Sequence, residues 1–160
     1  MLLLITGASG AGTSSVRRAL ELQQSERHLL LSGDPVAAAE VVAAPSASAL
    51  AGLAVCLLDL SPEVQASRLA ARGDDPSLLV HHQAFAEWMR RHAADPLYMP
   101  HVLSTGGWDE MCWDRLTSLR SSWQTHVIDT SAMTRPAVAE AVLAWCRSVL
   151  AGQAPILRLA

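Results

Sequence analysis

The chain alternates short apolar runs with longer segments in which apolar residues recur at helical spacing. Continuous apolar runs of about five residues are typical of strands buried on both faces of a parallel sheet. They occupy residues 1–5, 28–32, 54–59 and 126–129. Segments with helical periodicity occupy residues 13–27, 35–44, 61–72, 77–94, 108–119 and 136–150. The alternation predicts an α/β fold in which helices cover both faces of a parallel β-sheet.

Turn residues and apolar stripes set the expected helix boundaries and faces. Ser61 and Pro62 are a cap and a first helical residue, and Gly73 ends the helix that they begin. In the last helix the residues expected to face the sheet are Val138, Val142, Trp145 and Val149. In the helix at 77–94 the expected apolar side comprises Val80, Ala84, Trp88 and Met89.

A glycine-rich stretch joins the first apolar run to the first helix. It comprises Gly7, Ala8, Ser9, Gly10, Ala11, Gly12, Thr13, Ser14 and Ser15. The spacing matches the Walker A pattern Gly-x-x-x-x-Gly-Lys-Ser/Thr, except that Thr13 stands where the pattern has lysine. We expect the backbone N–H groups from Gly10 to Ser14 to cradle a phosphate chain, and the Ser14 hydroxyl to reach Mg²⁺. Thr13 can donate one hydrogen bond but brings no positive charge.

Three aspartates end or follow the later apolar runs, namely Asp34, Asp59 and Asp129. Because the carboxyl ends of parallel strands meet at one edge of a sheet, we expect these aspartates to lie near the glycine-rich loop. Asp34 is the candidate to accept a proton from a phosphate acceptor or to order magnesium. Asp59 is the second candidate for the magnesium site, through a water molecule.

A cluster of basic residues closes the helix at 77–94. Arg90 and Arg91 have two interpretations that the sequence leaves open: they close on a transferred phosphate, or they stabilise the helix C-terminus. The histidines His81, His82 and His92 lack ligand spacing, so we expect no metal site there.

The length and composition predict one folded domain spanning residues 1–160. Hydrophobic residues make up 51% of the chain and charged residues 17%, which is sufficient for a real core. The net charge of -3 gives no general attraction to nucleic acid or to an anionic membrane. Three widely spaced cysteines indicate a reduced, cytoplasmic compartment. No run approaches the roughly 20 apolar residues of a membrane span, so we expect a soluble protein.

Two arginines, Arg68 and Arg72, lie four residues apart in the helix after Asp59. With this pair and the glycine-rich loop, the chain resembles small P-loop kinases of the adenylate kinase and nucleotide-kinase-like superfamily, including uncharacterised bacterial members described as ATPases. The segments that carry the resemblance are 7–14, 30–35, 57–72, 83–100 and 128–131. Their similarity implies a nucleoside-monophosphate-kinase-like fold that binds ATP with Mg²⁺.

The resemblance also implies roles for individual residues. Arg68 would lie against the nucleotide base and Arg72 would contact phosphates, so that both stabilise charge on the transferred group. Arg90 would act from a helical lid at about 73–107. Thr130 would belong to the loop that holds adenine.

Three features depart from this family. Thr13 replaces the lysine, although sugar kinases resembling phosphoribulokinase have a similar Gly-Ala-Gly-Thr-Ser loop. Ser32 stands where the family has a strand-end aspartate, and no room remains between Arg27 and His28 for the acceptor-binding segment.

The expected function is transfer of the terminal phosphoryl group of ATP to a small acceptor, such as a nucleoside, a nucleotide or a specialised metabolite. The alternatives are a nucleotide-binding or interaction protein without turnover, and an assembly subunit whose loop binds only phosphate or sulfate. The sequence leaves open the acceptor, the choice of ATP over GTP, and homodimerisation.

Overall fold

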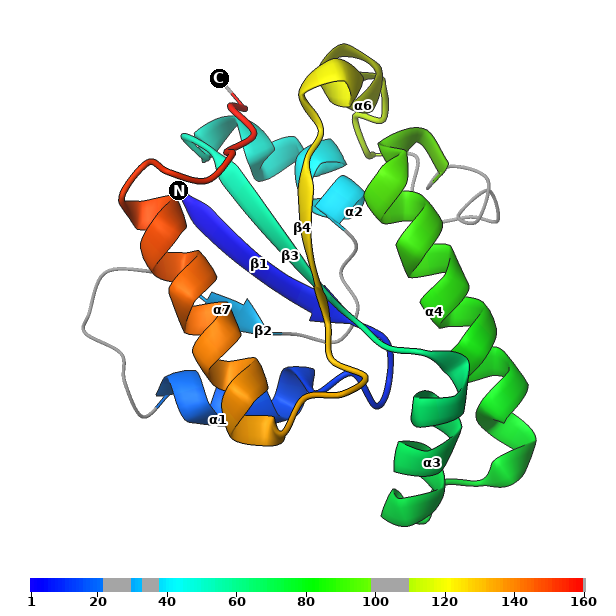
Figure 1. The fold of residues 1–160 in the computed structure, drawn as a ribbon. Helices are drawn as coiled ribbons and strands as arrows, with labels where there is room; N and C mark the ends of the chain where they lie inside the picture. The colour runs from blue at the N-terminus through cyan, green and yellow to red at the C-terminus, as the bar shows by residue number, and fades with distance from the viewer. Residues whose placement is uncertain (22–29, 33–37, 99–109, 160) are drawn as a thin grey trace.

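A parallel sheet forms the centre of the molecule (Figure 1). The computed structural model describes residues 1–21, 30–32, 38–98 and 110–159. Within these residues the strands are β1 (Leu2–Gly7), β2 (Leu30–Ser32), β3 (Leu53–Asp59) and β4 (Thr125–Asp129). Their spatial order is β2-β1-β3-β4, and every neighbouring pair is parallel. The predicted α/β fold with a parallel sheet is therefore confirmed, and each predicted apolar run contains a strand.

Helices pack on both faces of this sheet. On one face α1 (Thr13–Glu21) and α7 (Arg135–Leu150) pack against a core that includes Leu3 and Ile5. On the other face α2 (Ala38–Ala43), α4 (Leu79–Ala94) and α6 (Asp114–Leu119) pack against a core that includes Leu2 and Leu4. Successive residues of a strand point to opposite faces, so a strand that serves two cores must be apolar at nearly every position.

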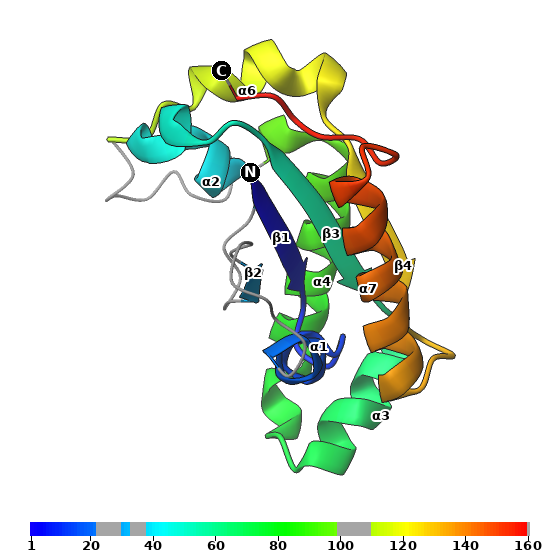
Figure 2. The same ribbon diagram turned by 90° about the vertical axis from the view of Figure 1, so that its left-hand side faces the viewer.

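The connections between strands place the glycine-rich loop at a switch point. From β1 the chain moves to β2 on one side, and the next strand, β3, lies on the other side of β1. In open parallel sheets, ligands bind beyond the carboxyl ends of strands at such a point. The helix α3 (Pro62–Arg72) lies beyond these ends, as both views show (Figures 1 and 2).

The predicted boundaries of α3 and the predicted face of α7 are confirmed. Ser61 Oγ accepts a hydrogen bond from the Val64 N–H at 3.3 Å, and Gly73 ends α3 with a φ of 84°. Such a left-handed C-terminal residue favours glycine. The buried residues of α7 include the predicted Val138, Val142, Trp145 and Val149.

The predicted apolar side of α4 is partly wrong. Val80 is 64% exposed and Ala84 is also exposed. The buried residues of α4 are Ala86, Met89 and His92. His92 follows Arg90 and Arg91 in the last turn, and its Nε2 accepts a hydrogen bond from the Ala39 N–H at 3.3 Å. The observed stripe therefore keeps Met89 of the predicted side and is completed by a polar residue with an internal partner.

The helix predicted at 108–119 is shorter than expected. Residues 108 and 109 lie outside the described residues, and α6 begins only at Asp114. The Cys112 N–H donates to the carbonyl oxygen of Ala43 at 2.7 Å, so the residues just before α6 are tied to the end of α2. Short 3-10 helices occupy Pro45–Ala49, Pro76–Leu78, Pro96–Tyr98 and Arg120–Ser122.

Of the segment expected to form a lid, residues 73–98 are described and 99–107 are not. Its main element, α4, packs against the sheet through Met89 and His92. Among the helices of the described ranges, none has both the length and the apolar character needed to cross a bilayer.

Candidate functional site

The glycine-rich loop presents unbonded backbone donors at the start of α1. The Gly12 carbonyl accepts hydrogen bonds from the N–H groups of Ser15 and Val16, both at 3.0 Å, and thereby starts the helix. Within the described residues, the N–H groups of Gly10, Gly12, Thr13 and Ser14 donate no hydrogen bond. Free N–H groups at a helix N-terminus, together with the helix dipole, form a site for an anion.

Glycines set the shape of this loop in two ways. Gly10 and Gly12 have φ values of 90° and 104°, which side chains disfavour. A Cβ on Gly7 would lie 2.6 Å from the Leu58 carbonyl oxygen, so β1 passes too close to β3 for any side chain. The chain therefore passes from β1 into the loop at Gly7, a position that only glycine can occupy.

A pocket of about 1020 Å³ opens over the loop. Its walls come from the loop, α1, α3, the start of α7 and Phe85 of α4. Its lining residues include Gly10, Gly12, Thr13, Ser14, Arg17, Arg68, Arg72, Phe85, Met133, Thr134 and Arg135. The charged residues among the described lining are all arginines. A chain with a net charge of -3 thus concentrates positive charge at one concave surface.

Arg68 joins the loop to the segment after β4. Its Nη1 donates to the Gly10 carbonyl oxygen and to Thr130 Oγ1, both at 3.1 Å. Its Nη2 donates to the carbonyl oxygens of Thr130, at 2.6 Å, and Met133, at 3.5 Å. The guanidinium that the family resemblance assigns to the nucleotide therefore already binds three backbone carbonyls of the protein.

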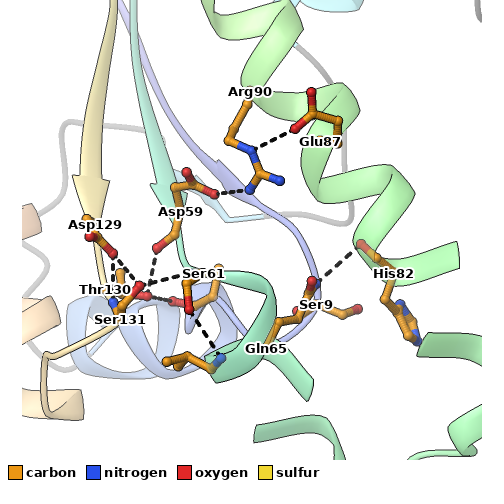
Figure 3. A network of polar contacts seen from close by, with 12 residues as sticks. Ser9, Asp59, Ser61, Gln65, His82, Glu87, Arg90, Asp129, Thr130 and Ser131 are labelled. Atoms are coloured by element: carbon orange, nitrogen blue, oxygen red, sulfur yellow. Dashed lines mark hydrogen bonds and ion pairs between the residues drawn. The ribbon is translucent and has the colours of Figure 1, made fainter. Parts of the chain in front are cut away.

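Thr130 is completely buried beneath Arg68. Its N–H donates to the Asp59 carbonyl oxygen at 2.8 Å, and its hydroxyl lies 2.9 Å from the same oxygen (Figure 3). The hydroxyl also lies 3.3 Å from the Ala11 carbonyl oxygen. Thr130 thus links β3, β4 and the loop, and the pocket lining contains its neighbours Met133 and Thr134 instead.

Gln65 is a residue of this site that the sequence analysis missed. It is 1% exposed, and its amide nitrogen donates to the Ser9 carbonyl oxygen at 2.9 Å and to the His82 carbonyl oxygen at 3.3 Å (Figure 3). One side chain of α3 therefore holds the loop and α4 together. Its position three residues before Arg68, one turn earlier on the helix, is the available signal in the sequence.

Two predicted site residues, Asp59 and Arg90, contact each other. Arg90 Nη1 lies 2.9 Å from Asp59 Oδ1, and Arg90 Nε lies 3.1 Å from Glu87 Oε2 (Figure 3). Partial burial opposes the charged guanidinium, but the hydrogen bond and the charge of Asp59 outweigh it and raise the pKa of Arg90. Hydrogen bonds from Arg91 and Arg90 lower the pKa of Glu87. Neither Asp59 nor Arg90 belongs to the described pocket lining.

The remaining predicted residues have different surroundings. Arg72 lines the pocket but is 56% exposed and forms an ion pair with Asp74, which raises the pKa of Arg72. Asp129 lies opposite Asp59 in the sheet, and its carboxylate accepts hydrogen bonds from the N–H and hydroxyl of Ser131. Asp34 lies outside the described residues.

The described donors fit magnesium poorly. Ser14 lines the pocket, but no carboxylate is among the described lining residues, and Asp59 is paired with Arg90. Over the described ranges, no three His, Cys, Asp or Glu side chains are grouped as metal ligands. These residues alone do not make a protein-held magnesium site.

Comparison of the chain with family models, with curated proteins and with solved structures gave no match. The loop and its pocket therefore carry the functional argument.

Proposed function

We propose that this chain is a P-loop phosphotransferase that binds ATP at the glycine-rich loop and passes its terminal phosphoryl group to a small acceptor. The acceptor would be a nucleoside, a nucleotide or a specialised metabolite. One observation carries the proposal: unbonded N–H groups at the start of α1 open into a pocket of about 1020 Å³ whose described charged residues are arginines. A nucleoside triphosphate is polyanionic and has a size that such a pocket can hold.

The proposed roles follow from phosphoryl transfer being largely positioning and charge neutralisation. The N–H groups of Gly12, Thr13 and Ser14 would hold phosphate oxygens, and the dipole of α1 would favour the negative charge. Arg68 would fix the shape of the loop, and Arg72 would reach the phosphates by leaving its exposed pair with Asp74. None of these roles depends on magnesium, because the described residues do not form a protein-held site for it.

A second candidate function is nucleotide binding without turnover. The observation that favours it is the Arg90–Asp59 ion pair of 2.9 Å, which commits both a predicted lid cation and a predicted metal-site acid to each other. Thr13 in place of lysine points the same way, because transition-state charge would lose one stabilising cation.

Isothermal titration calorimetry with ATP, ADP and AMP, with magnesium and with EDTA, tests binding. The variant Ser14→Asp should abolish binding of ATP, because it adds a negative charge at an exposed position among the phosphate donors. The same charge favours the N-terminus of α1, so this variant should fold normally. The matched control is Thr117→Asp, an exposed position in α6 at the opposite end of the sheet (Figure 1).

An acceptor screen with γ-labelled ATP then separates the two functions. Transfer of label to a small molecule by the wild type, and not by Ser14→Asp, supports the phosphotransferase. Binding without transfer or phosphate release supports the second candidate. Absence of ATP binding in every buffer would refute both.

A further inference from the structure

Compared with the Walker A pattern, the glycine-rich loop lacks the positive charge of one lysine side chain. The Thr13 side chain lines the pocket where the Walker A pattern has lysine, and a hydroxyl is neutral. Backbone N–H groups supply only partial charge. A triphosphate bound at this loop needs a mobile cation that comes from elsewhere in the pocket.

Among the four described arginines of the lining, three have partners within the protein. Arg68 donates to the carbonyl oxygens of the loop and of the segment after β4. Arg72 is paired with Asp74. Arg17 also has an interaction within the protein.

Arg135, the fourth arginine, differs from these three. Its side chain is exposed, it lines the pocket, and it makes no hydrogen bond or ion pair with any other described side chain. It begins α7, which packs beside α1 through the core shared by Val16 and Val138. The guanidinium is therefore free to turn toward a ligand on the loop.

The position of Arg135 is also unfavourable for the helix that carries it. A positive charge at a helix N-terminus opposes the helix dipole. The first turn of α7 contains no acidic residue to offset it. Local helix stability thus gives no reason for arginine here, whereas an anionic ligand in the pocket would.

We propose that Arg135 binds the terminal phosphates of the nucleotide and supplies the charge that Thr13 does not. This inference rests on the proposed function, because it places the nucleotide on the loop. Arg135 acts on the ligand directly, from α7, and replaces the lysine in space although not in sequence. Arg135 therefore contributes more to the affinity for a triphosphate, whose terminal phosphates it contacts, than to the affinity for a monophosphate.

Calorimetry with the non-hydrolysable β,γ-imido analogue of ATP, and with AMP, tests the inference in four proteins. Arg135→Ala should weaken binding of the ATP analogue by roughly 10- to 100-fold, the range for one charge-assisted hydrogen-bonding group, and binding of AMP by less than about threefold. Arg147→Ala removes an exposed arginine from the other end of α7 and should leave both affinities unchanged. The double variant Thr13→Lys/Arg135→Ala should recover most of the lost affinity, because the lysine restores the charge at the loop.

The outcomes separate this inference from the proposed function. Wild-type binding of the ATP analogue with no loss in Arg135→Ala overturns the role of Arg135 and leaves the function standing. A loss that Thr13→Lys does not recover also overturns it, because Arg135 would then act elsewhere than at the missing charge. No binding by the wild type refutes the proposed function, and the role of Arg135 falls with it. Arg135 is exposed and its charge opposes the dipole of α7, so the Tm of Arg135→Ala should be no lower than that of the wild type, which confirms that the variant is folded.

Discussion

Replacing Arg68 by methionine tests whether this arginine stabilises the loop or binds a ligand. Arg68→Met keeps the apolar stem but removes the guanidinium that bonds Gly10, Thr130 and Met133. Hydrogen bonds from a charged donor contribute about 1.5–3 kcal/mol each, but water in the pocket can rehydrate the freed carbonyls, so we expect a total loss of about 2–4 kcal/mol. For a chain of this size that loss lowers the Tm by roughly 5–15 °C.

Urea and thermal unfolding of the ligand-free protein measure this loss. The control is Arg72→Met, one turn further along α3, where the guanidinium is exposed and, among the described residues, pairs with Asp74 alone. Its stability should stay close to that of the wild type. Equal unfolding midpoints for Arg68→Met and the wild type would refute the role of Arg68 in holding the loop. A loss of nucleotide affinity without a loss of stability would instead assign Arg68 to the ligand.

Four further substitutions probe the loop and the buried polar residues of α3 and α4. Gly12→Ala should lower the free energy of unfolding by about 1–2 kcal/mol, because the φ of 104° is unfavourable for alanine. No atom lies within 4 Å of the added Cβ, so no clash adds to this cost, and an unchanged Tm in thermal unfolding would contradict the prediction. Gly7→Ala should cost more in the same assay, because its Cβ would lie 2.6 Å from the Leu58 carbonyl oxygen, and a smaller loss than for Gly12→Ala would exclude that clash. Gln65→Leu removes the donor for two backbone carbonyls and should lower the free energy of unfolding by about 1–3 kcal/mol in urea, a result that an unshifted midpoint would disprove. Burial lowers the pKa of His92 from 6.5 to about 4, so the unfolded chain takes up a proton first, and the free energy of unfolding should fall by about 3 kcal/mol as the pH drops from 6.5 to 4. His92→Phe should flatten this part of the urea-midpoint profile, and an identical pH profile would show that His92 is not its source.

The sequence predicts those parts of the fold that depend on local pattern. Continuous apolar runs mark β1 and β3 because nearly every residue of these two strands is buried against one of two cores. Capping residues mark α3 because Ser61 and Gly73 satisfy the helix ends in ways that few other residues can. The glycine-rich loop belongs to the same class, since its glycines are required by backbone conformation and by the closeness of β1 and β3.

The destinations of long polar side chains could not be predicted in this way. Arg68 and Arg90 were expected at a ligand, but their partners come from segments distant in sequence, such as Thr130 and Asp59. His92 was absent from the predicted apolar side of α4, yet it is buried, and its Nε2 accepts a hydrogen bond from the Ala39 N–H. Pairings of this kind depend on which elements the fold brings together, and periodicity does not encode them.

The contacts of Thr130 also bear on the order in which the site forms during folding. The loop lies within the first 15 residues, yet Thr130 bonds the Ala11 carbonyl across 119 residues of chain, and Arg68 bridges Thr130 to Gly10. Contacts of such long sequence separation require most of the chain to be present before they form. During synthesis the loop would therefore emerge early and acquire its final geometry late, once β4 has docked against β3. Ligand affinity would then report complete folding of the domain.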